Sequence, residues 1–211
     1  MDGERLELFI RSMDEAPLSD RLDRLRREAL AKEVPIIRPG TCSLIRTLLV
    51  MKKPAHILEI GTAVGFSALF MLENSEADIT TMEDWPPRIA AARANFARFG
   101  VEDRVRLLEG DAVDLLPGLA GPYDFVFMDA AKGQYLRYLP DVLRLMPSGG
   151  ILLSDNVFLD GDIIESHFAV ERRDRTIHKR MRAFLREVTH SEDLVTTILP
   201  VGDGMTLSVK R

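Results

Sequence analysis

The sequence predicts an α/β fold built on a mostly parallel sheet, and three features of the chain carry this prediction. From Pro54 onwards, short apolar segments alternate with amphipathic helical segments, which is typical of βαβ units. The last two apolar segments instead flank Gly202-Asp203-Gly204, a turn that suits an antiparallel hairpin. The residues before Pro54 form a helical N-terminal extension. With 211 residues, the chain is expected to be a single domain, with 1–53 as the helical segment and 54–211 as the core.

Seven apolar segments are expected to form the sheet. They are His56–Ile60, Ile79–Glu83, Val105–Glu109, Phe125–Met128, Ile151–Ser154, Leu194–Leu199 and Met205–Val209. The first five look buried on both faces, as strands of a parallel sheet covered by helices are. Helices are expected between them. These lie near Ser67–Asn74, Pro87–Phe99 and Tyr135–Met146.

The N-terminal extension is expected to be helical from about Glu4 to Met51, with one interruption. Two prolines in Val34–Gly40 restrict their neighbours to extended conformations, so a second helix is expected to start at about Thr41. The apolar residues of the first helix fall on one face. They are Leu18, Leu22, Leu25, Ala29 and Leu30.

The composition, 46% hydrophobic and 29% charged, is that of an ordinary globular protein. No apolar run approaches the roughly 20 residues that span a bilayer, so we expect a cytoplasmic protein without a membrane partner. Cys42, the single cysteine, excludes an intramolecular disulfide framework and is expected to be a small buried hydrophobe. A net charge of -5 means that nucleic acid could bind only at a local basic patch.

A glycine-containing turn follows the first strand and enters a helix. Gly61 and Gly65 let the backbone turn tightly and pass close to a ligand. Ala63 stands where a dinucleotide fingerprint has its second glycine, so a cofactor without a pyrophosphate is favoured. Glu83 ends the second strand, where a carboxylate can accept hydrogen bonds from ribose hydroxyls, and Asp111 is placed to border an adenine. Turn glycines, a solvated Glu83 and a helix-capping Asp111 are the simpler alternatives.

Hard oxygen ligands follow the next two strands. Asp129 comes directly after Phe125–Met128, and Asp155 and Asn156 follow Ile151–Ser154. Two carboxylates and an amide oxygen converging from adjacent strand ends suit Mg²⁺, Mn²⁺ or Ca²⁺ rather than zinc. The alternative is a pair of strand-end turns that cap the following helices.

At these residues the chain resembles the class I methyltransferases, and more narrowly the cation-dependent O-methyltransferases that include the catechol and caffeoyl-CoA enzymes. The resemblance extends from Val34–Gly40 to the terminal hairpin. It implies a Rossmann-like, seven-stranded fold, S-adenosylmethionine as the cofactor, and a homodimer whose interface involves the N-terminal segment or the hairpin.

The resemblance also assigns roles to single residues. Ile37 would lie against the methionine part of the cofactor, with Glu59 and Ser67 near its amino and carboxylate groups. Glu83 would bind the ribose, Asp111-Ala112 would face the adenine, and Asp129 would border both the cofactor and the cation. Asp129, Asp155 and Asn156 match the metal ligands of the family.

Lys132, three residues after Asp129, occupies the position of the family's general base. A nearby cation should make its ammonium lose a proton more readily, which favours that role. A solvated loop lysine is the alternative.

Positive charge is concentrated between the fifth strand and the hairpin. The residues concerned are Arg172, Arg173, Arg175, Lys179, Arg180 and Arg182. Arginines can bridge phosphates and stack on unpaired bases, as recognition of an RNA loop requires. The stretch most resembles bacterial tRNA 5-hydroxyuridine methyltransferases, which make 5-methoxyuridine at wobble position 34 of the anticodon. By this resemblance, tRNA is the predicted acceptor. The 5-hydroxyl and 4-carbonyl oxygens of that base chelate a cation much as a catechol does.

Three alternatives stay open for this region. The charges can belong to a solvated helix face paired with Glu171 and Asp174. The acceptor can be a small catechol or caffeoyl ester, with the arginines binding a coenzyme A phosphate or nothing. A noncatalytic protein that keeps the cofactor fold is the third, although the intact set of ligands and Lys132 argues against it. His178 could touch a base or a phosphate, but a lone helical histidine is more often simply exposed.

Overall fold

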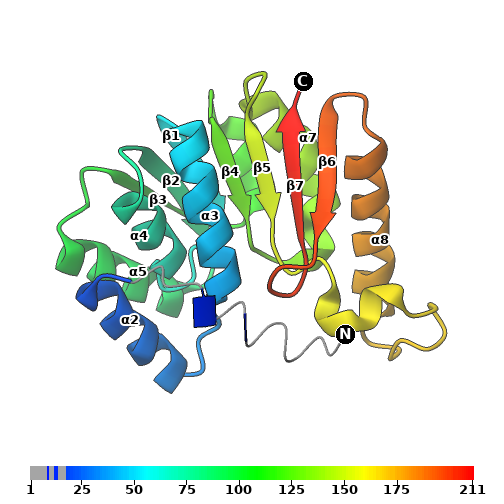
Figure 1. Ribbon diagram of the computed structural model, residues 1–211, viewed down its shortest axis with the longest axis horizontal. Helices are drawn as coiled ribbons and strands as arrows, with labels where there is room; N and C mark the ends of the chain where they lie inside the picture. The colour runs from blue at the N-terminus through cyan, green and yellow to red at the C-terminus, as the bar shows by residue number, and fades with distance from the viewer. Residues whose placement is uncertain (1–8, 10–11, 14–17) are drawn as a thin grey trace.

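The computed structural model describes residue 9, residues 12–13 and residues 18–211. Its strands are β1 (His56–Ile60), β2 (Asp78–Glu83), β3 (Val105–Glu109), β4 (Phe125–Met128), β5 (Ile151–Ser154), β6 (Leu194–Leu199) and β7 (Met205–Lys210). They form one sheet in the order β3-β2-β1-β4-β5-β7-β6 (Figure 1). β1 to β5 pair in parallel, and β7 runs antiparallel to both of its neighbours. The predicted sheet and its terminal hairpin are confirmed.

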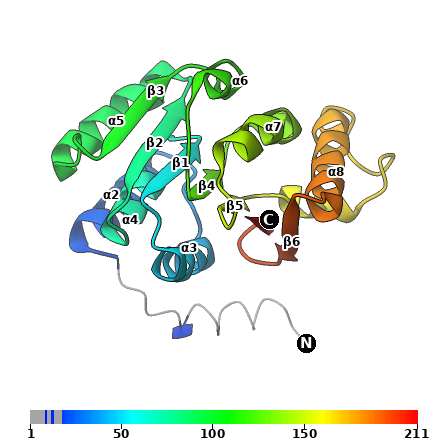
Figure 2. The ribbon, with the colours of Figure 1, turned by 90° about the horizontal axis from the view of Figure 1, so that it is seen from above.

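Helices cover both faces of this sheet (Figure 2). They are α2 (Asp20–Ala31), α3 (Pro39–Lys52), α4 (Phe66–Glu73), α5 (Pro86–Phe99), α6 (Ala112–Leu115), α7 (Tyr135–Leu145) and α8 (Arg175–His190). Apolar side chains of α2 to α5 pack with one face of the sheet, and those of α6 to α8 pack with the other. Two hydrophobic layers therefore hold the strands between them, which places the strand ends in fixed positions.

Local sequence sets where the helices begin and end. Ser19 caps α2, because its side chain accepts a hydrogen bond of 3.2 Å from the Leu22 N–H. Pro39 opens α3, two residues earlier than the sequence predicts, because a proline at the first helical position loses no hydrogen bond. Gly100 ends α5 in the left-handed conformation. The other predicted strand and helix boundaries either match the structure or differ from it by one residue.

Two expectations about burial are wrong. β3 is not buried on both faces but consists of half-buried and exposed positions, because it is an edge strand. Leu30 is exposed although Leu22, Leu25 and Ala29 of the same helix are buried, because α2 is amphipathic over a narrower face than predicted. Of the helix predicted from Glu4, residues 4–8, 10–11 and 14–17 lie outside the described residues.

The carboxyl ends of β1 to β5 lie at one edge of the sheet, and the turn between β6 and β7 lies at the same edge (Figure 1). Open α/β sheets bind ligands at this edge, where strand order reverses. In this sheet the order reverses between β1 and β4. Within the described part of the chain, no helix is long and apolar enough to cross a membrane.

Candidate active site

A cleft of about 860 Å³ opens at this edge of the sheet. Ten of the predicted site residues line it, namely Ile37, Gly61, Ser67, Glu83, Asp111, Ala112, Asp129, Lys132, Asp155 and Asn156. Glu59 and Gly65 do not line it, and neither do the six basic residues between Arg172 and Arg182. The structure therefore brings the predicted cofactor and cation residues into one cavity, and it leaves the predicted RNA-binding residues outside.

Gly61 lies where the turn after β1 contacts the backbone at the end of β4. Its φ of +103° is a left-handed conformation that favours glycine, and a Cβ placed there would lie 2.1 Å from the carbonyl oxygen of Asp129. The turn after β1 thus packs directly against the backbone at the end of β4. Any side chain at position 61 would push Asp129 away from its place.

Gly65 has a different reason to be glycine from the one its sequence context suggests. It caps α4 with φ +83°, and a Cβ there would meet the Phe96 ring at 2.7 Å. The missing side chain therefore makes room for α5 to pack rather than for a ligand to approach.

Glu83 is buried at the end of β2 and is not solvated. Its carboxylate accepts hydrogen bonds from the backbone N–H of Ala63 at 2.9 Å and of Trp85 at 3.1 Å. Each carboxylate oxygen keeps a further lone pair for a ligand. The two bonds thus hold Glu83 in place at the cleft wall without exhausting its capacity to bind ribose hydroxyls.

Asp111 both caps a helix and lines the cleft. Its side chain accepts a 2.8 Å hydrogen bond from the Val113 N–H at the start of α6. The helix-capping alternative is thus present in the structure, and it places Asp111 beside Ala112 in the cleft wall.

Glu59 lies behind the cleft wall and is fully buried. Its two carboxylate oxygens accept hydrogen bonds of 2.5 Å from the hydroxyls of Ser67 and Thr81. Burial raises the pKa of Glu59 to about 7, and the two hydrogen bonds oppose this rise. Glu59 therefore reaches the cleft only through Ser67, which it orients.

Asp129, Asp155 and Asn156 gather at the ends of β4 and β5. The Lys132 ammonium joins two of them, at 2.6 Å from Asp129 Oδ1 and 2.9 Å from Asn156 Oδ1. Asp155 is buried and accepts a 2.7 Å hydrogen bond from the Asn156 N–H. Burial, followed by the charge of Asp129, raises the pKa of Asp155 to about 6.

These side chains fit a hard divalent cation. A positive group already lies between two of the three oxygen ligands, and two carboxylates share the site. Among the described residues, no group of three or more His, Cys, Asp or Glu side chains is arranged so that it could hold a metal ion by itself. A cation here would consequently depend on the amide oxygen of Asn156 as well as on the two carboxylates.

Lys132 is half-buried rather than a solvated loop residue. Besides Asp129 and Asn156, its ammonium contacts the hydroxyl of Tyr135 at 3.1 Å. Burial alone lowers the pKa of Lys132, but the interactions with Tyr135 and Asp129 outweigh it and raise the pKa above its usual range. These contacts favour the protonated form of Lys132, and the lower pKa expected beside a bound cation stays a prediction.

Comparison with known proteins decides what kind of enzyme has this cleft. Residues 11–211 match the O-methyltransferase family. The chain belongs to that family. A catechol O-methyltransferase of Niastella koreensis is 32% identical over 183 residues, which cover 83% of this chain and 82% of that protein. This chain is thus a methyltransferase that uses S-adenosylmethionine to methylate an oxygen.

Solved structures of methyltransferases share the fold. The SAH-bound Podospora anserina methyltransferase PaMTH1 has a TM-score of 0.86 and 29% identity, over 100% of this chain and 97% of that one. An O-methyltransferase from Bacillus cereus in complex with SAH has a TM-score of 0.81 and 25% identity, over 93% of each chain. SAH is the product that S-adenosylmethionine leaves after methyl transfer, so both neighbours hold the spent cofactor.

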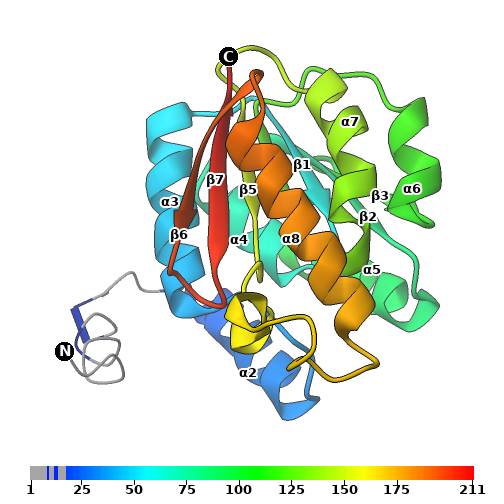
Figure 3. The same ribbon diagram turned by 90° about the vertical axis from the view of Figure 1, so that its right-hand side faces the viewer.

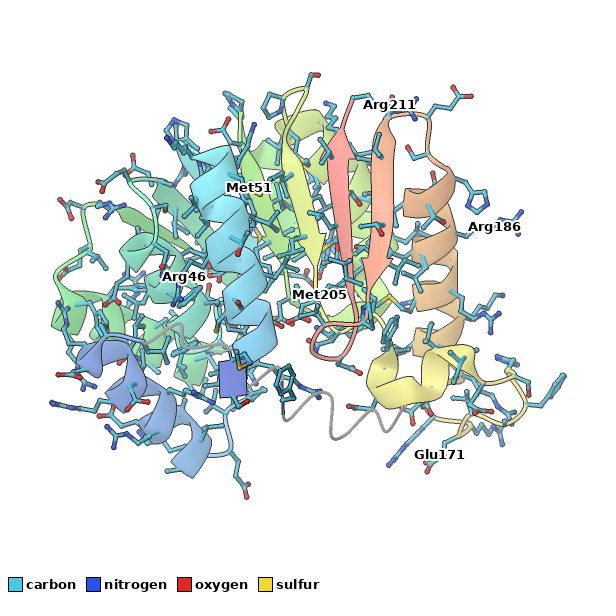
Figure 4. The ribbon with its side chains drawn as sticks, viewed as in Figure 1. Arg46, Met51, Glu171, Arg186, Met205 and Arg211 are labelled. Carbon is cyan, nitrogen blue, oxygen red and sulfur yellow. The ribbon has the colours of Figure 1, made fainter. Side chains whose placement is uncertain are left out.

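In this O-methyltransferase, four of the six basic side chains predicted to bind RNA form bonds within the chain. Arg175 donates to the carbonyls of Val170 and Phe168, and Arg180 donates to the carbonyl of Gly133. Arg182 likewise bonds two carbonyls of the preceding segment, and Arg173 pairs with neighbouring carboxylates. This segment, with Glu171 labelled, extends outward beside α8 (Figure 4). Arg172 and Lys179 have no partner among the described residues.

His178 is buried, contrary to the expectation of an exposed histidine. Only 2% of its surface is accessible, and neither ring nitrogen has a hydrogen-bond partner among the described residues. Its ring centroid lies 6.2 Å from that of His167. The amphipathic period of α8 places position 178 on its inner face with Met181 and Phe184, so His178 cannot stack on a base.

The cleft also contains residues that the sequence did not single out as site residues. Arg38, Asp160 and Asp203 line its wall on the side of β5 and β7. Asp203 belongs to the turn predicted for the hairpin, but no local pattern distinguishes a turn aspartate from one that borders a site. Its position in the cleft wall depends on the folding of the hairpin against the segment after β5.

Proposed function

We propose that this O-methyltransferase transfers the methyl group of S-adenosylmethionine to a hydroxyl of a small catechol-like acceptor whose neighbouring oxygens chelate a divalent cation. The observation that carries the proposal is the gathering of Asp129, Asp155 and Asn156 in the same cleft as the Gly61 turn and Glu83. A relative that covers most of the chain is a catechol O-methyltransferase, which supports this acceptor class.

The proposed roles divide along the cleft. Ile37, Ser67, Glu83, Asp111 and Ala112 bind the cofactor, with Glu59 and Gly65 supporting them from behind the wall. Asp129, Asp155 and Asn156 hold the cation, for which Mg²⁺ is the first candidate and Mn²⁺ or Ca²⁺ the others. When bound, such a cation lowers the pKa of a coordinated hydroxyl and fixes its orientation.

Lys132 is the proposed general base. Its ammonium is bonded to Asp129, which favours the protonated form. Lys132 must therefore lose the Asp129 contact before it can accept the proton of the acceptor hydroxyl. Tyr135 then remains as its neighbour, because its hydroxyl is anchored to the carbonyls of Met128 and Asp155.

5-Hydroxyuridine at wobble position 34 of a tRNA anticodon is the second candidate acceptor. It is favoured by two exposed basic residues, Arg172 and Lys179, which have no partner in the part of the chain that the structure describes. Its two neighbouring oxygens also suit the same cation. Arg175, Arg180 and Arg182 count against it, because their guanidinium groups are already bonded to backbone carbonyls. We therefore place the small acceptor first.

A homodimer remains part of the proposal, as does a cytoplasmic location. Val50 and Met51 of α3 and Val195 of β6 are exposed although they are apolar, and Met51 is labelled at the end of α3 in Figure 4. Burying these residues against a second copy would remove apolar surface from water. Light scattering coupled to gel filtration measures whether the mass is that of one chain or of two.

The acceptor and the cation are tested in one assay. The enzyme is incubated with S-adenosylmethionine labelled in the methyl group, Mg²⁺, and either a simple catechol or tRNA that carries 5-hydroxyuridine. We expect label in the catechol, and no transfer after a chelator removes the cation. Asp155→Asn should lower kcat/KM about a thousandfold, since the cation contributes several kcal/mol to the transition state. Asp114→Asn is the matched control, because Asp114 is exposed and lies outside the cleft.

Each outcome decides a separate part of the proposal. Transfer that survives the chelator, or an Asp155→Asn variant as active as Asp114→Asn, would show that the reaction needs no cation here. Label that appears only in tRNA would replace the small acceptor with 5-hydroxyuridine. Rising salt should then weaken tRNA binding steeply.

A further inference from the structure

The segment that follows the proposed cation ligands has an unusual backbone. Asn156, Leu159 and Asp160 have φ values of +57°, +54° and +53°, and Gly161 has +97°. Residues with a Cβ adopt this left-handed conformation at a cost of about 1–2 kcal/mol each. Such a run persists only where surrounding contacts hold it, and these conformations concentrate at functional sites.

The turn of the C-terminal hairpin supplies those contacts. The N–H groups of Val157 and Phe158 donate to the carbonyls of Gly204 and Asp203, at 3.0 and 2.9 Å. Both side-chain oxygens of Asp203 accept the Asp160 N–H at 3.0 Å. The hairpin turn and the segment after β5 lie side by side, as Figure 3 shows. Residues more than 40 positions apart are thus joined by backbone bonds and one carboxylate.

Gly204 allows the hairpin turn and the segment after β5 to lie close together. Its φ is +76°, and a Cβ there would lie 2.3 Å from the ring of Phe158. The two segments can approach only because position 204 has no side chain. The contact is therefore a built feature of the fold rather than a chance approach of two loops.

The contact also lies in the cleft. Leu159, Asp160 and Asp203 line the cleft together with Asp155 and Asn156. The cofactor residues Glu83 and Asp111 follow β2 and β3 on the other side of β1 and β4. The hairpin turn consequently borders the half of the cleft that lies beyond the proposed cation site, away from the adenosine half.

We propose that Asp203 is a positioning residue for the acceptor half of the cleft: through the Asp160 N–H it holds the left-handed segment after Asn156, and with it the wall against which the acceptor binds. The proposal rests on the proposed function, because that function assigns the acceptor to this half. Arg38, whose guanidinium lies 3.8 Å from the Asp160 carboxylate, adds little because both groups are exposed.

Three variants test this role. Asp203→Ala removes the acceptor of the Asp160 N–H, and Asp203→Asn keeps one oxygen that can accept it. Asp193→Ala is the matched control, because Asp193 is an exposed aspartate beside the other end of β6 and its carboxylate has no partner among the described residues. The measurements are KM and kcat for the catechol, SAH affinity by calorimetry, Mn²⁺ binding by electron paramagnetic resonance, and hydrogen exchange of the amides of residues 157–160.

We expect Asp203→Ala to raise the KM for the catechol about tenfold or more, because a hydrogen bond to a charged group is lost. The amides of residues 157–160 should exchange faster, kcat should change less than KM, and SAH affinity should stay within about twofold. Asp203→Asn should lie between wild type and Asp203→Ala, and Asp193→Ala should match wild type.

The proposal is overturned if Asp203→Ala leaves both the KM for the catechol and the amide exchange unchanged. It is also overturned if SAH affinity falls by as large a factor as KM rises, or if Asp203→Asn shows the same rise in KM as Asp203→Ala. If Asp203→Ala does not fold, Asp203→Asn against wild type decides by the same readouts. A wild type that leaves the catechol unmethylated refutes the proposed function instead. Asp203 is then judged on Mn²⁺ binding and amide exchange, where weaker binding and faster exchange support the proposal and unchanged values overturn it.

Discussion

The two halves of the cleft hold their backbone in different ways. In the cofactor half, Glu83 bonds Trp85, two residues away, and Ala63 in the neighbouring turn, and Asp111 bonds the N–H of Val113. In the acceptor half, the segment after Asn156 depends on a hairpin turn more than 40 residues later in the chain. The bonds in the cofactor half thus join residues two to 20 positions apart, and those in the acceptor half join residues more than 40 positions apart.

Gly61→Ala is expected to have the largest effect, because Gly61 lies at the contact between the turn after β1 and the end of β4. Its left-handed φ and the contact of a Cβ with the Asp129 carbonyl should together cost about 3 kcal/mol of unfolding free energy. Urea unfolding measures this loss. Gly118→Ala is the control, since a Cβ there meets nothing within 4 Å. A Gly61→Ala variant as stable as the control would show that the two halves are not joined at this turn.

Glu59→Gln tests the support behind the cofactor half through its pH dependence. The pKa of Glu59 is about 7 in the folded chain, above its ordinary value of 4.5. The folded state therefore binds the proton more tightly, and this stabilisation is fully present below pH 4.5 and is lost as the pH rises to 7. A glutamine has no proton to lose.

We therefore expect the stability of Glu59→Gln relative to wild type to increase by about 2 kcal/mol between pH 5 and pH 8. Urea unfolding of both proteins at the two pH values measures the difference. Ser67→Ala in the same series removes one of the hydrogen bonds that oppose the rise, so it should enlarge the pH effect. A difference independent of pH would mean that Glu59 does not titrate in this range.

His178→Leu gives the smallest expected effect and concerns the helix beside the acceptor half. The buried ring has two nitrogens without partners among the described residues, and an apolar side chain avoids their desolvation. We expect a gain of about 1 kcal/mol in unfolding free energy. His190→Leu, at an exposed position of α8, should change it by less than about 0.5 kcal/mol. A destabilised His178→Leu would indicate that the imidazole has a polar role.

The cofactor half was the more predictable from sequence. Gly61, Glu83 and Asp111 each lie at the end of a strand or within two residues of it, and parallel strands bring such residues to one edge. Asp129, Asp155 and Asn156 were predictable for the same reason. The reason for Gly65 was not, because the Phe96 ring that requires it belongs to another helix.

The basic residues between Arg172 and Arg182 show that a concentration of positive charge in the sequence does not by itself predict a binding surface. Arg175 and Arg182 look like a phosphate-binding surface in the sequence, but their guanidinium groups hold the preceding segment by its carbonyls. A charged residue in a sequence does not reveal its partner, and an arginine with five donors can bond backbone as readily as phosphate.

The sequence by itself determined the order of strands and helices, the hairpin, and the set of polar residues at the strand ends, because these depend on periodicity and on turn residues close together in the chain. Only the tertiary structure decided that Glu59 lies behind the wall, that His178 is buried, and that Asp203 holds the segment after Asn156. Each of these depends on which distant segments pack together. Burial and hydrogen-bond partners belong to pairs of segments, and a single segment does not encode them.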